Sequence, residues 1–381
     1  MNTTMSTIYL DYAAATPVDP QVLEAMEPFF VEQFYNPSAT YQAARGVAAE
    51  LKQARATVAH WLGARANEII FTAGGTEANN LAIDGILRQY PNGNVVVSAI
   101  EHESVLAPAH QFDCREVSVG ADGLLNLAAL ENAIDENTVL VSIMYANNEV
   151  GTVQPLKEVA QIIARKRTAR KSKLPLYVHT DACQAANYLD LHVSRLGVDM
   201  LTLNGGKIYG PKQSGVLYVG AHVKLQPQIL GGGQERNLRS GTENVAQSVG
   251  LAKALDLAQS MRHEESARLS KLQQVFIEKL EAVPGVIING SRKKRLPNNV
   301  HITIEGSDNE RVLVQLDEAG ILAAAGSACS ASNEEPSHVL RAMGISDRDA
   351  QASLRFTMGR QTTLEAVTKT AATLQQLIAR K

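Results

Sequence analysis

Between Glu68 and Val219, the chain alternates short apolar runs with longer segments of helical periodicity. Helices are expected from Thr76, from about Ser104 and from Pro155. This alternation predicts βαβ units, and therefore an α/β fold with a mostly parallel sheet covered by helices. The apolar runs expected as strands are EIIFTAG, VVVSAIEH, VLVSIMYANNEVG, LYVHTDACQ, DMLTLNGG and GVLYV.

Two of these runs end in side chains that can carry chemistry. Leu176–Gln184 contains Asp181, and Leu201–Val219 contains Lys207 just after its strand-like part. Because ligands of an open α/β sheet collect at the carboxyl ends of the strands, both side chains are expected at one site. An amine forms a Schiff base with the aldehyde of pyridoxal phosphate, and a carboxylate keeps its pyridine nitrogen protonated. The pair therefore predicts a pyridoxal phosphate site.

Isolated lysines and aspartates are more often surface and turn residues. Lys207, however, lies between Gly205-Gly206 and Ile208–Pro211, a setting tight enough to hold the lysine in place. The Gly-Gly-Lys is not a Walker phosphate loop, because the earlier glycine and the following Ser or Thr are missing.

A second interpretation concerns the alternating residues His179, Asp181 and Cys183, which could share one strand face as metal ligands. Asp181 is better used on the pyridine nitrogen, with His179 as its hydrogen-bonding support. Cys183 is then expected to be a small buried residue. We therefore expect no resident metal site.

Five motifs, HTDACQ, GGKIYGPK, GGGQERNLRSGTENV, GSACSAS and LRFTMGR, resemble those of cysteine desulfurases of the group that includes iron–sulfur cluster assembly enzymes. The resemblance runs from Tyr9 to Arg360, with the motifs in the order and spacing of that family. It implies the aminotransferase-like fold (fold type I) of pyridoxal phosphate enzymes. It also implies conversion of L-cysteine to L-alanine, transfer of the sulfur to an acceptor such as an iron–sulfur scaffold protein, and a homodimer.

The resemblance assigns cofactor contacts to residues at strand and helix ends. Gly75 and Thr76 match the phosphate-binding turn, where free amides and the positive end of a helix dipole bind an anion; Thr76 is expected to be the N-cap. His102 matches the ring stacked on the cofactor, which also moves protons. The other expected contacts are Asn148, Asp181, Gln184, Asn204, Gly205, Gly206, Lys207 and Thr242, the last donated across the dimer interface.

Substrate chemistry is expected at Cys329 and Arg355. Cys329 lies in a run of small residues without apolar periodicity, which predicts a thiol on a loop, and its thiolate would attack the sulfur of bound cysteine. Cys329 could also serve as a transient iron–sulfur ligand. Arg355 follows on a strand and would grip the carboxylate of the substrate, next to Asn148. A surface ion pair is disfavoured for Arg355, because its sequence neighbours are apolar.

Two positions depart from the family pattern. Related enzymes carry Ser-x-His immediately before the lysine, whereas this chain has Asn204-Gly205-Gly206. Asn204 can still donate to a phosphate, but Gly206 removes an imidazole, so weaker cofactor binding is expected. Tyr41 stands where the related enzymes usually have His.

The expected domains are an N-terminal arm at 1–20, a large cofactor-binding domain at 21–260 and a smaller α+β domain at 261–381 that carries Cys329. Asn36–Tyr41 is expected to cap a long helix ending near Gly63, and Asn244–Ala282 to form a helix that leads into the smaller domain. That domain should contain the strand VHITIEG, a helix at Asn309–Gly320, the strand SLRFTMG and a final helix from Thr362.

Composition and charge argue against several other classes of protein. A net charge of −3 argues against a nucleic-acid binder, and no apolar run is long enough to span a membrane. Three cysteines, without ligand spacing, suit a reducing cytoplasm rather than a disulfide framework. The N-terminus shows no targeting pattern. The alternatives left open are a selenocysteine lyase, another pyridoxal phosphate lyase or transaminase, and a cofactor-poor homologue acting as a binding partner.

Overall fold

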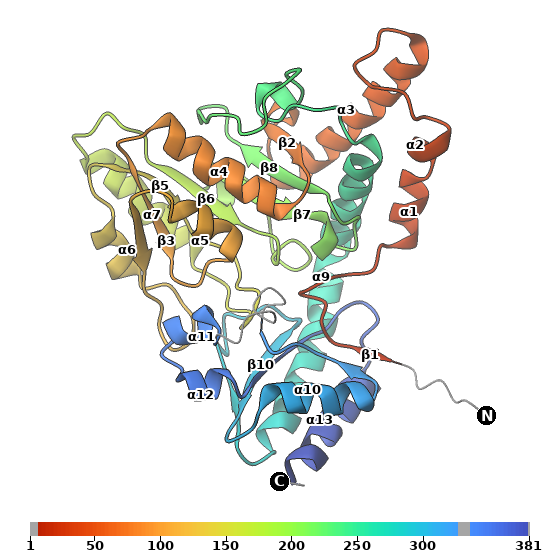
Figure 1. Ribbon diagram of the computed structural model, residues 1–381, viewed down its shortest axis with the longest axis vertical. Helices are drawn as coiled ribbons and strands as arrows, with labels where there is room; N and C mark the ends of the chain where they lie inside the picture. The colour runs from red at the N-terminus through yellow and green to blue at the C-terminus, as the bar shows by residue number, and fades with distance from the viewer. Residues whose placement is uncertain (1–6, 327–335, 380–381) are drawn as a thin grey trace.

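The computed structural model describes residues 7–326 and 336–379. In this part of the chain, a seven-stranded sheet with helices on both faces lies above a smaller assembly of strands and helices (Figure 1). The long helix α9 (Val245–Glu281) runs from the first to the second. The prediction of an α/β fold is confirmed.

The large sheet has the strand order β2-β8-β7-β6-β5-β3-β4. Strand β8 alone runs in the opposite direction to the other six strands, so the sheet is mostly parallel, as predicted. The strands are β2 (Ile69–Thr72), β3 (Asn94–Ser98), β4 (Cys114–Val117), β5 (Thr138–Ser142), β6 (Tyr177–Asp181), β7 (Met200–Asn204) and β8 (Gly215–Val219).

The inner strands are buried on both faces, which explains their continuous apolar sequences. In β3, Val96 belongs to the apolar cluster on one face, whereas Val95 and Val97 belong to the cluster on the other. The edge strand β4 was not predicted. Its sequence CREV is polar and half-exposed, so it lacks the apolar signal of a central strand.

Helices cover both faces of this sheet, and none in the described part of the chain is both long and apolar enough to cross a membrane. They are α1 (Pro20–Met26), α2 (Pro28–Val31), α3 (Gln42–Leu62), α4 (Gly75–Gln89), α5 (Glu103–Ala109), α6 (Leu127–Ala133), α7 (Leu156–Ala169) and α8 (Val193–Leu196). Single-turn 3₁₀ helices lie at Ala66–Glu68, Gly205–Lys207 and Glu235–Asn237.

Some helix ends differ from the expectation. Thr76 is not the N-cap of α4, because the chain already turns at Gly74, whose φ of 146° is open to glycine, and Thr76 lies within the first turn. At the start of α3, Tyr41 is the N-cap but makes no side-chain capping bond. The helix ends at Leu62, next to the predicted Gly63, which caps it in the left-handed conformation.

The smaller assembly contains an antiparallel sheet of order β12-β10-β9 and a pair of short parallel strands, β1 and β11. Its strands are β1 (Ile8–Tyr9), β9 (Val286–Ile288), β10 (Asn299–Ile304), β11 (Ile321–Leu322) and β12 (Ser353–Thr357). Its helices are α10 (Asn309–Glu318), α11 (His338–Ala342), α12 (Asp347–Ala350) and α13 (Leu364–Ala379). Because β1 pairs with β11, the N-terminal segment lies against C-terminal elements.

Helix α9 contributes to two separate apolar cores. Its first part, from Val245 to Ala258, packs against the large sheet. Its second part packs Leu269, Phe276 and Leu280 against the smaller sheet. The division into domains near residue 260 stays a prediction, but this helix provides the continuous connection between the two cores.

Phe276 lies at the centre of the apolar core beside the smaller sheet. It is fully buried, and its ring packs edge to face against Phe356 with 5.4 Å between the ring centroids. We expect Phe276→Ala to destabilise this core by about 3–5 kcal/mol, because it removes apolar contacts and leaves a cavity. Urea unfolding followed by circular dichroism should show an earlier transition. Lys279→Ala, at an exposed position of the same helix, is the matched control and should unfold like wild type. Equal stability of all three proteins would contradict this account of the core.

Candidate active site

Two cavities meet at the carboxyl ends of β6 and β7. The inner cavity, of about 220 Å³, is lined by residues that include His102, Asp181 and Arg355. The outer cavity, of about 620 Å³, is lined by the start of α4 and the segment after β7. The two cavities adjoin, and they share Ala14, Gly75, Thr76, Asn204 and Lys207.

Most of the predicted site residues lie in these cavities. Gly205 lies beneath the surface, where a Cβ atom would come within 2.1 Å of Ser214 Oγ, so only glycine fits. Thr242 is exposed and lines neither cavity of its own chain. Cys329 lies outside the described residues. The inner cavity contains Gly75, Thr76, His102, Asn148, Asp181, Gln184, Asn204, Lys207 and Arg355, and the outer cavity adds Gly206.

Asp181 ends β6 and presents a buried carboxylate. Its Oδ2 accepts a hydrogen bond from Asn79 Nδ2 at 2.7 Å, and its Oδ1 accepts from the backbone N–H of Cys183 at 2.9 Å. These donors offset the desolvation of the charge. Sequence reasoning missed Asn79. The sequence signal that could have identified it is helical spacing. Asn79 lies three residues before Ala82 and four before Ile83, so it falls on the buried face of α4.

His179 does not support Asp181 by a hydrogen bond, so this expectation was wrong. Its ring nitrogens lie 2.8 Å from Ser142 Oγ and 3.0 Å from Thr202 Oγ1. Burial lowers the pKa of His179 to about 4, although the charge of Asp181 opposes the shift. The imidazole is therefore neutral at pH 7 and ties β5 to β7 beneath the site.

The Cys183 side chain packs against the turn at Gly75, where an added Cβ would lie 2.9 Å from its Sγ. Burial first, and then the charge of Asp181, raise the pKa of the Cys183 thiol well above its usual value. Among the described residues, no group of three or more His, Cys, Asp or Glu side chains could hold a metal.

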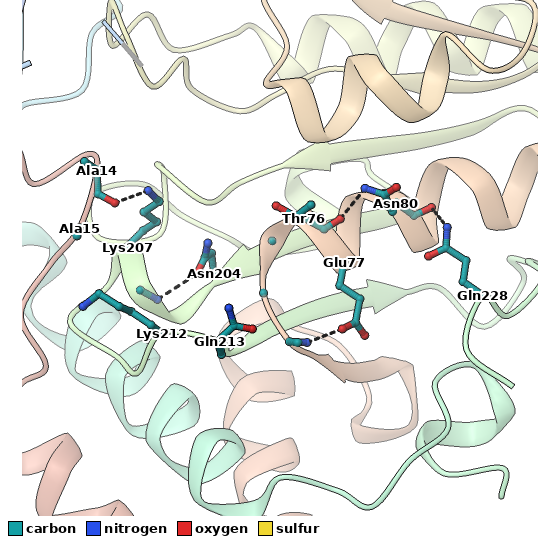
Figure 2. Close-up of a pocket in the computed structure, with 14 residues that line it drawn as sticks. Ala14, Ala15, Thr76, Glu77, Asn80, Asn204, Lys207, Lys212, Gln213 and Gln228 are labelled. Atoms are coloured by element: carbon teal, nitrogen blue, oxygen red, sulfur yellow. Dashed lines mark hydrogen bonds between the residues drawn. The ribbon is translucent and has the colours of Figure 1, made fainter. Parts of the chain in front are cut away.

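Lys207 reaches the shared wall of the cavities from the 3₁₀ turn after β7. Its Nζ donates to the backbone carbonyls of Ala13 at 2.8 Å and Ala14 at 2.6 Å, and Figure 2 shows the side chain extended toward Ala14. Gln184 Nε2 donates to the same Ala13 oxygen at 3.1 Å. Asn187 Nδ2 holds the Lys207 carbonyl at 2.8 Å. The N-terminal segment thus closes the site over the lysine.

The start of α4 gives the outer cavity an anion-binding wall. Gly74, Gly75 and Thr76 line it at the start of the helix, where the amides of the first turn have no partner within the helix and the dipole is positive. Glu77 does not oppose an anion there, because its carboxylate accepts from Ala73 N at 3.0 Å and pairs with Arg239 at 3.0 Å. Asn204 Oδ1 accepts from Gly206 N at 3.0 Å, which leaves the Asn204 amide nitrogen as a donor (Figure 2).

Arg355 is 2% exposed and enters the inner cavity from β12. Nη1 donates to the Asn148 carbonyl at 3.0 Å, and Nη2 donates to Asp11 Oδ1 at 2.8 Å. An ion pair is therefore present, but in the interior rather than on the surface. Each terminal nitrogen carries two N–H groups and uses one here, so one N–H on each is left for a ligand.

This set of groups fits pyridoxal phosphate. The inner cavity has an amine, Lys207, and a hydrogen-bonded carboxylate, Asp181, as the aldehyde and the pyridine nitrogen require. The adjoining outer cavity has helix amides for a phosphate. The imidazole of His102 lines the same inner cavity.

The chain is similar over nearly its full length to several known proteins. It is 40% identical to a cysteine desulfurase IscS of Dictyoglomus turgidum, over 97% of this chain and 94% of that protein. It is 39% identical to cysteine desulfurase IscS 1 of Archaeoglobus fulgidus, over 98% and 97%. Among solved structures, a NifS-like protein from Rickettsia africae is similar with a TM-score of 0.88 and 30% identity, over 98% of this chain and all of the other. SspA in complex with cysteine is similar with a TM-score of 0.81 and 36% identity, over 92% and 99%.

The model of the family described as aminotransferase class-V matches residues 8–369, which is nearly the whole chain. The match includes every element that lines the two cavities. Its relatives also align over nearly their full length. Because of this match and these relatives, this chain, with its seven-stranded sheet, belongs to the class-V aminotransferase family.

Proposed function

We propose that this chain is a pyridoxal phosphate-dependent cysteine desulfurase, which takes the sulfur of L-cysteine and releases L-alanine. The observation that carries the proposal is the convergence of Lys207, Asp181, His102 and Arg355 on one cavity. Relatives of nearly equal length are named cysteine desulfurases, and a similar structure contains cysteine. The direct test is incubation with L-cysteine and a thiol reductant, which releases the persulfide sulfur as sulfide, measuring alanine and sulfide for wild type and for Lys207→Ala.

Pyridoxal phosphate, when bound, supplies an electron sink that stabilises negative charge on carbon atoms next to the amino group. The chain's own residues hold and orient the reacting groups. Lys207 holds the cofactor through Nζ and accepts or returns a proton there. Asp181, fixed by Asn79 and by the Cys183 amide, keeps a negative charge at the ring nitrogen. His102, whose imidazole lines the same cavity, would contact the ring of the bound cofactor and move a second proton.

Arg355 binds the substrate carboxylate. The Asp11 carboxylate and the Asn148 carbonyl hold the guanidinium from one side, so its orientation is set before the substrate arrives. The two remaining N–H groups on Nη1 and Nη2 then form charged hydrogen bonds with the two carboxylate oxygens.

Cys329 is the nucleophile in this proposal. The other two thiols are poor candidates, because burial raises the pKa of Cys114 to about 11 and that of Cys183 well above its usual value. The described residues on either side of the Cys329 segment both approach Glu149, next to Asn148 of the inner cavity. Ser337 Oγ donates to Glu149 Oε2 at 2.6 Å, and a Cβ on Gly326 would lie 3.4 Å from the same oxygen.

In the sulfur transfer, an S–S bond forms between Cys329 and the substrate sulfur while the carbon–sulfur bond of the substrate breaks. The electron pair left on carbon takes up a proton, which yields alanine and a Cys329 persulfide. The persulfide passes its outer sulfur to an acceptor, such as an iron–sulfur scaffold protein. This chemistry suits a reducing compartment such as the cytoplasm.

A homodimer is part of the proposal. Helices α1 and α2 and the loop after them expose large apolar side chains, with Val31 76% and Phe34 66% exposed. A second copy of the chain would cover this surface. Thr242, exposed and outside both cavities of its own chain, would then reach the phosphate side of the partner's outer cavity.

We expect Cys329→Ser to lose desulfuration while it retains the cofactor, because a serine hydroxyl is not ionised at neutral pH. Alanine and sulfide would be measured with L-cysteine, and bound cofactor by its visible absorbance. Cys114→Ser, on the edge strand, is the control and should keep wild-type activity. Undiminished alanine formation by Cys329→Ser would remove this thiol from the mechanism.

Arg355→Ala should raise the KM for cysteine about 10- to 100-fold, the usual effect of losing hydrogen bonds to a charged group. Steady-state kinetics would measure it, with cofactor absorbance as a check of the ring site. Asp11→Asn, which weakens only the guanidinium's internal partner, should raise KM much less. An unchanged KM in Arg355→Ala would refute the carboxylate clamp.

Gly206→His should tighten cofactor binding about 10-fold or more if the ring reaches the phosphate. A Cβ at this position fits, since its nearest neighbours would be Asn204 Oδ1 at 3.5 Å and Lys212 Cγ at 3.6 Å. The measurement is a titration of cofactor-free wild type and variant with pyridoxal phosphate. Equal affinities would mean that another group already replaces the imidazole. The absorbance of a Schiff base between cofactor and protein, if it persisted in Lys207→Ala without added amine, would overturn the assignment of the lysine.

A further inference from the structure

A chain of hydrogen-bonded side chains connects Asp181 to His102 along the wall of the inner cavity. Asn79 Nδ2 lies 2.7 Å from Asp181 Oδ2 and 2.8 Å from Ser104 Oγ. Ser104 Oγ in turn lies 2.8 Å from His102 Nδ1. The members come from β6, from α4 and from the first residues of α5, so three separate elements meet in this chain.

The polarity of these bonds has one consistent arrangement. An ionised Asp181 can only accept, so the atom of Asn79 that faces it is the NH₂ group, whose second hydrogen goes to Ser104 Oγ. The backbone N–H of Ser104 donates to His102 Nδ1 at 3.1 Å, so that nitrogen carries no proton. With its oxygen receiving from Asn79, the Ser104 hydroxyl points its own hydrogen at the same Nδ1, whose single lone pair is shared between the hydroxyl at 2.8 Å and the backbone N–H.

Burial shows that this arrangement is a fixed part of the site. Asn79 is fully buried, and Asp181 and Ser104 are each 8% exposed. The Asn79 oxygen, Oδ1, has no hydrogen-bond partner among the described residues. A buried unpartnered acceptor is unfavourable, so the two bonds from Nδ2 determine how the amide is oriented.

We propose that Asn79 and Ser104 are positioning residues that couple the carboxylate of Asp181 to the imidazole of His102. Ser104 is hydrogen-bonded to Nδ1 of His102. In the neutral imidazole, the proton is therefore on Nε2. Asn79 supplies the donor that keeps the Ser104 hydroxyl directed at His102. A role for this coupling in catalysis rests on the proposed function of His102. The hydrogen-bonded connection between Asp181 and His102 does not depend on that function.

The test uses ¹⁵N-histidine NMR of the cofactor-loaded protein, with the His102 signals assigned by their loss in His102→Gln. In wild type, Nδ1 should show the signal of an unprotonated, hydrogen-bonded nitrogen and Nε2 that of a protonated one. Ser104→Ala should move the Nδ1 signal toward that of a nitrogen with weaker hydrogen bonding, and Ser104→Thr should restore it. A protonated Nδ1 in the wild-type protein would overturn the proposal.

The decisive variant is Asn79→Ala, because Asn79 does not touch His102. It should move the Nδ1 signal when Ser104 is present and add nothing in the Asn79→Ala, Ser104→Ala double variant. Gln89→Ala, at an exposed position at the end of the same helix, should leave the signal unchanged. If Asn79→Ala has no effect, or the same effect with and without Ser104, no coupling exists.

Measurements of activity distinguish a failure of the coupling from a failure of the proposed function. Ser104→Ala should lower kcat about two- to tenfold with little change in KM, and Ser104→Thr should recover it. If His102→Gln keeps full activity, the proposed role of His102 fails while the NMR result still decides the coupling. If the NMR shifts are absent but His102→Gln is inactive, the coupling fails and the proposed function stands.

Discussion

The site depends on keeping one negative charge, that of Asp181, inside the protein. A buried carboxylate is stable only if hydrogen-bond donors replace the water it has lost. The backbone N–H of Cys183 comes from the turn after β6, and the amide of Asn79 comes from α4, whose start also forms the outer cavity. The position of α4 against β6 therefore fixes the ring site and the anion site together.

The pairing of β6 with β7 adds the second requirement. Asp181 lies opposite Thr202 in this parallel pair, and the chain reaches Lys207 five residues later. The neutral His179 holds β5 and β7 in place beneath the carboxylate by bonds to Ser142 and Thr202. The sheet thus sets the acid at the end of β6 and brings the 3₁₀ turn that carries the amine directly after the end of the adjacent strand β7.

The N-terminal segment connects the two cores. Its carbonyls at Ala13 and Ala14 accept from Lys207, and Asp11 pairs with Arg355 of β12. Further along, Asp19 pairs with Arg360 at 2.7 Å, and the guanidinium of Arg360 stacks on the Tyr209 ring. The same segment therefore touches the proposed cofactor lysine and the proposed substrate arginine, so a shift of the smaller assembly would be felt at both.

By itself, the sequence determined the α/β sheet, because buried strands need continuous apolar runs, and it located Asp181 and Lys207, because polar residues directly after such runs lie at strand ends. It also determined α9, since its caps and periodicity are local. Only the tertiary structure decided that β4 completes the sheet edge, that His179 bonds away from Asp181, and that Asn79 and Ser104 join Asp181 to His102. The hydrogen bonds of Asn79 with Ser104 and Asp181, and of His179 with Ser142, join residues 25, 102 and 37 positions apart in the chain. Local propensity carries no information about which distant donor a buried acceptor will find.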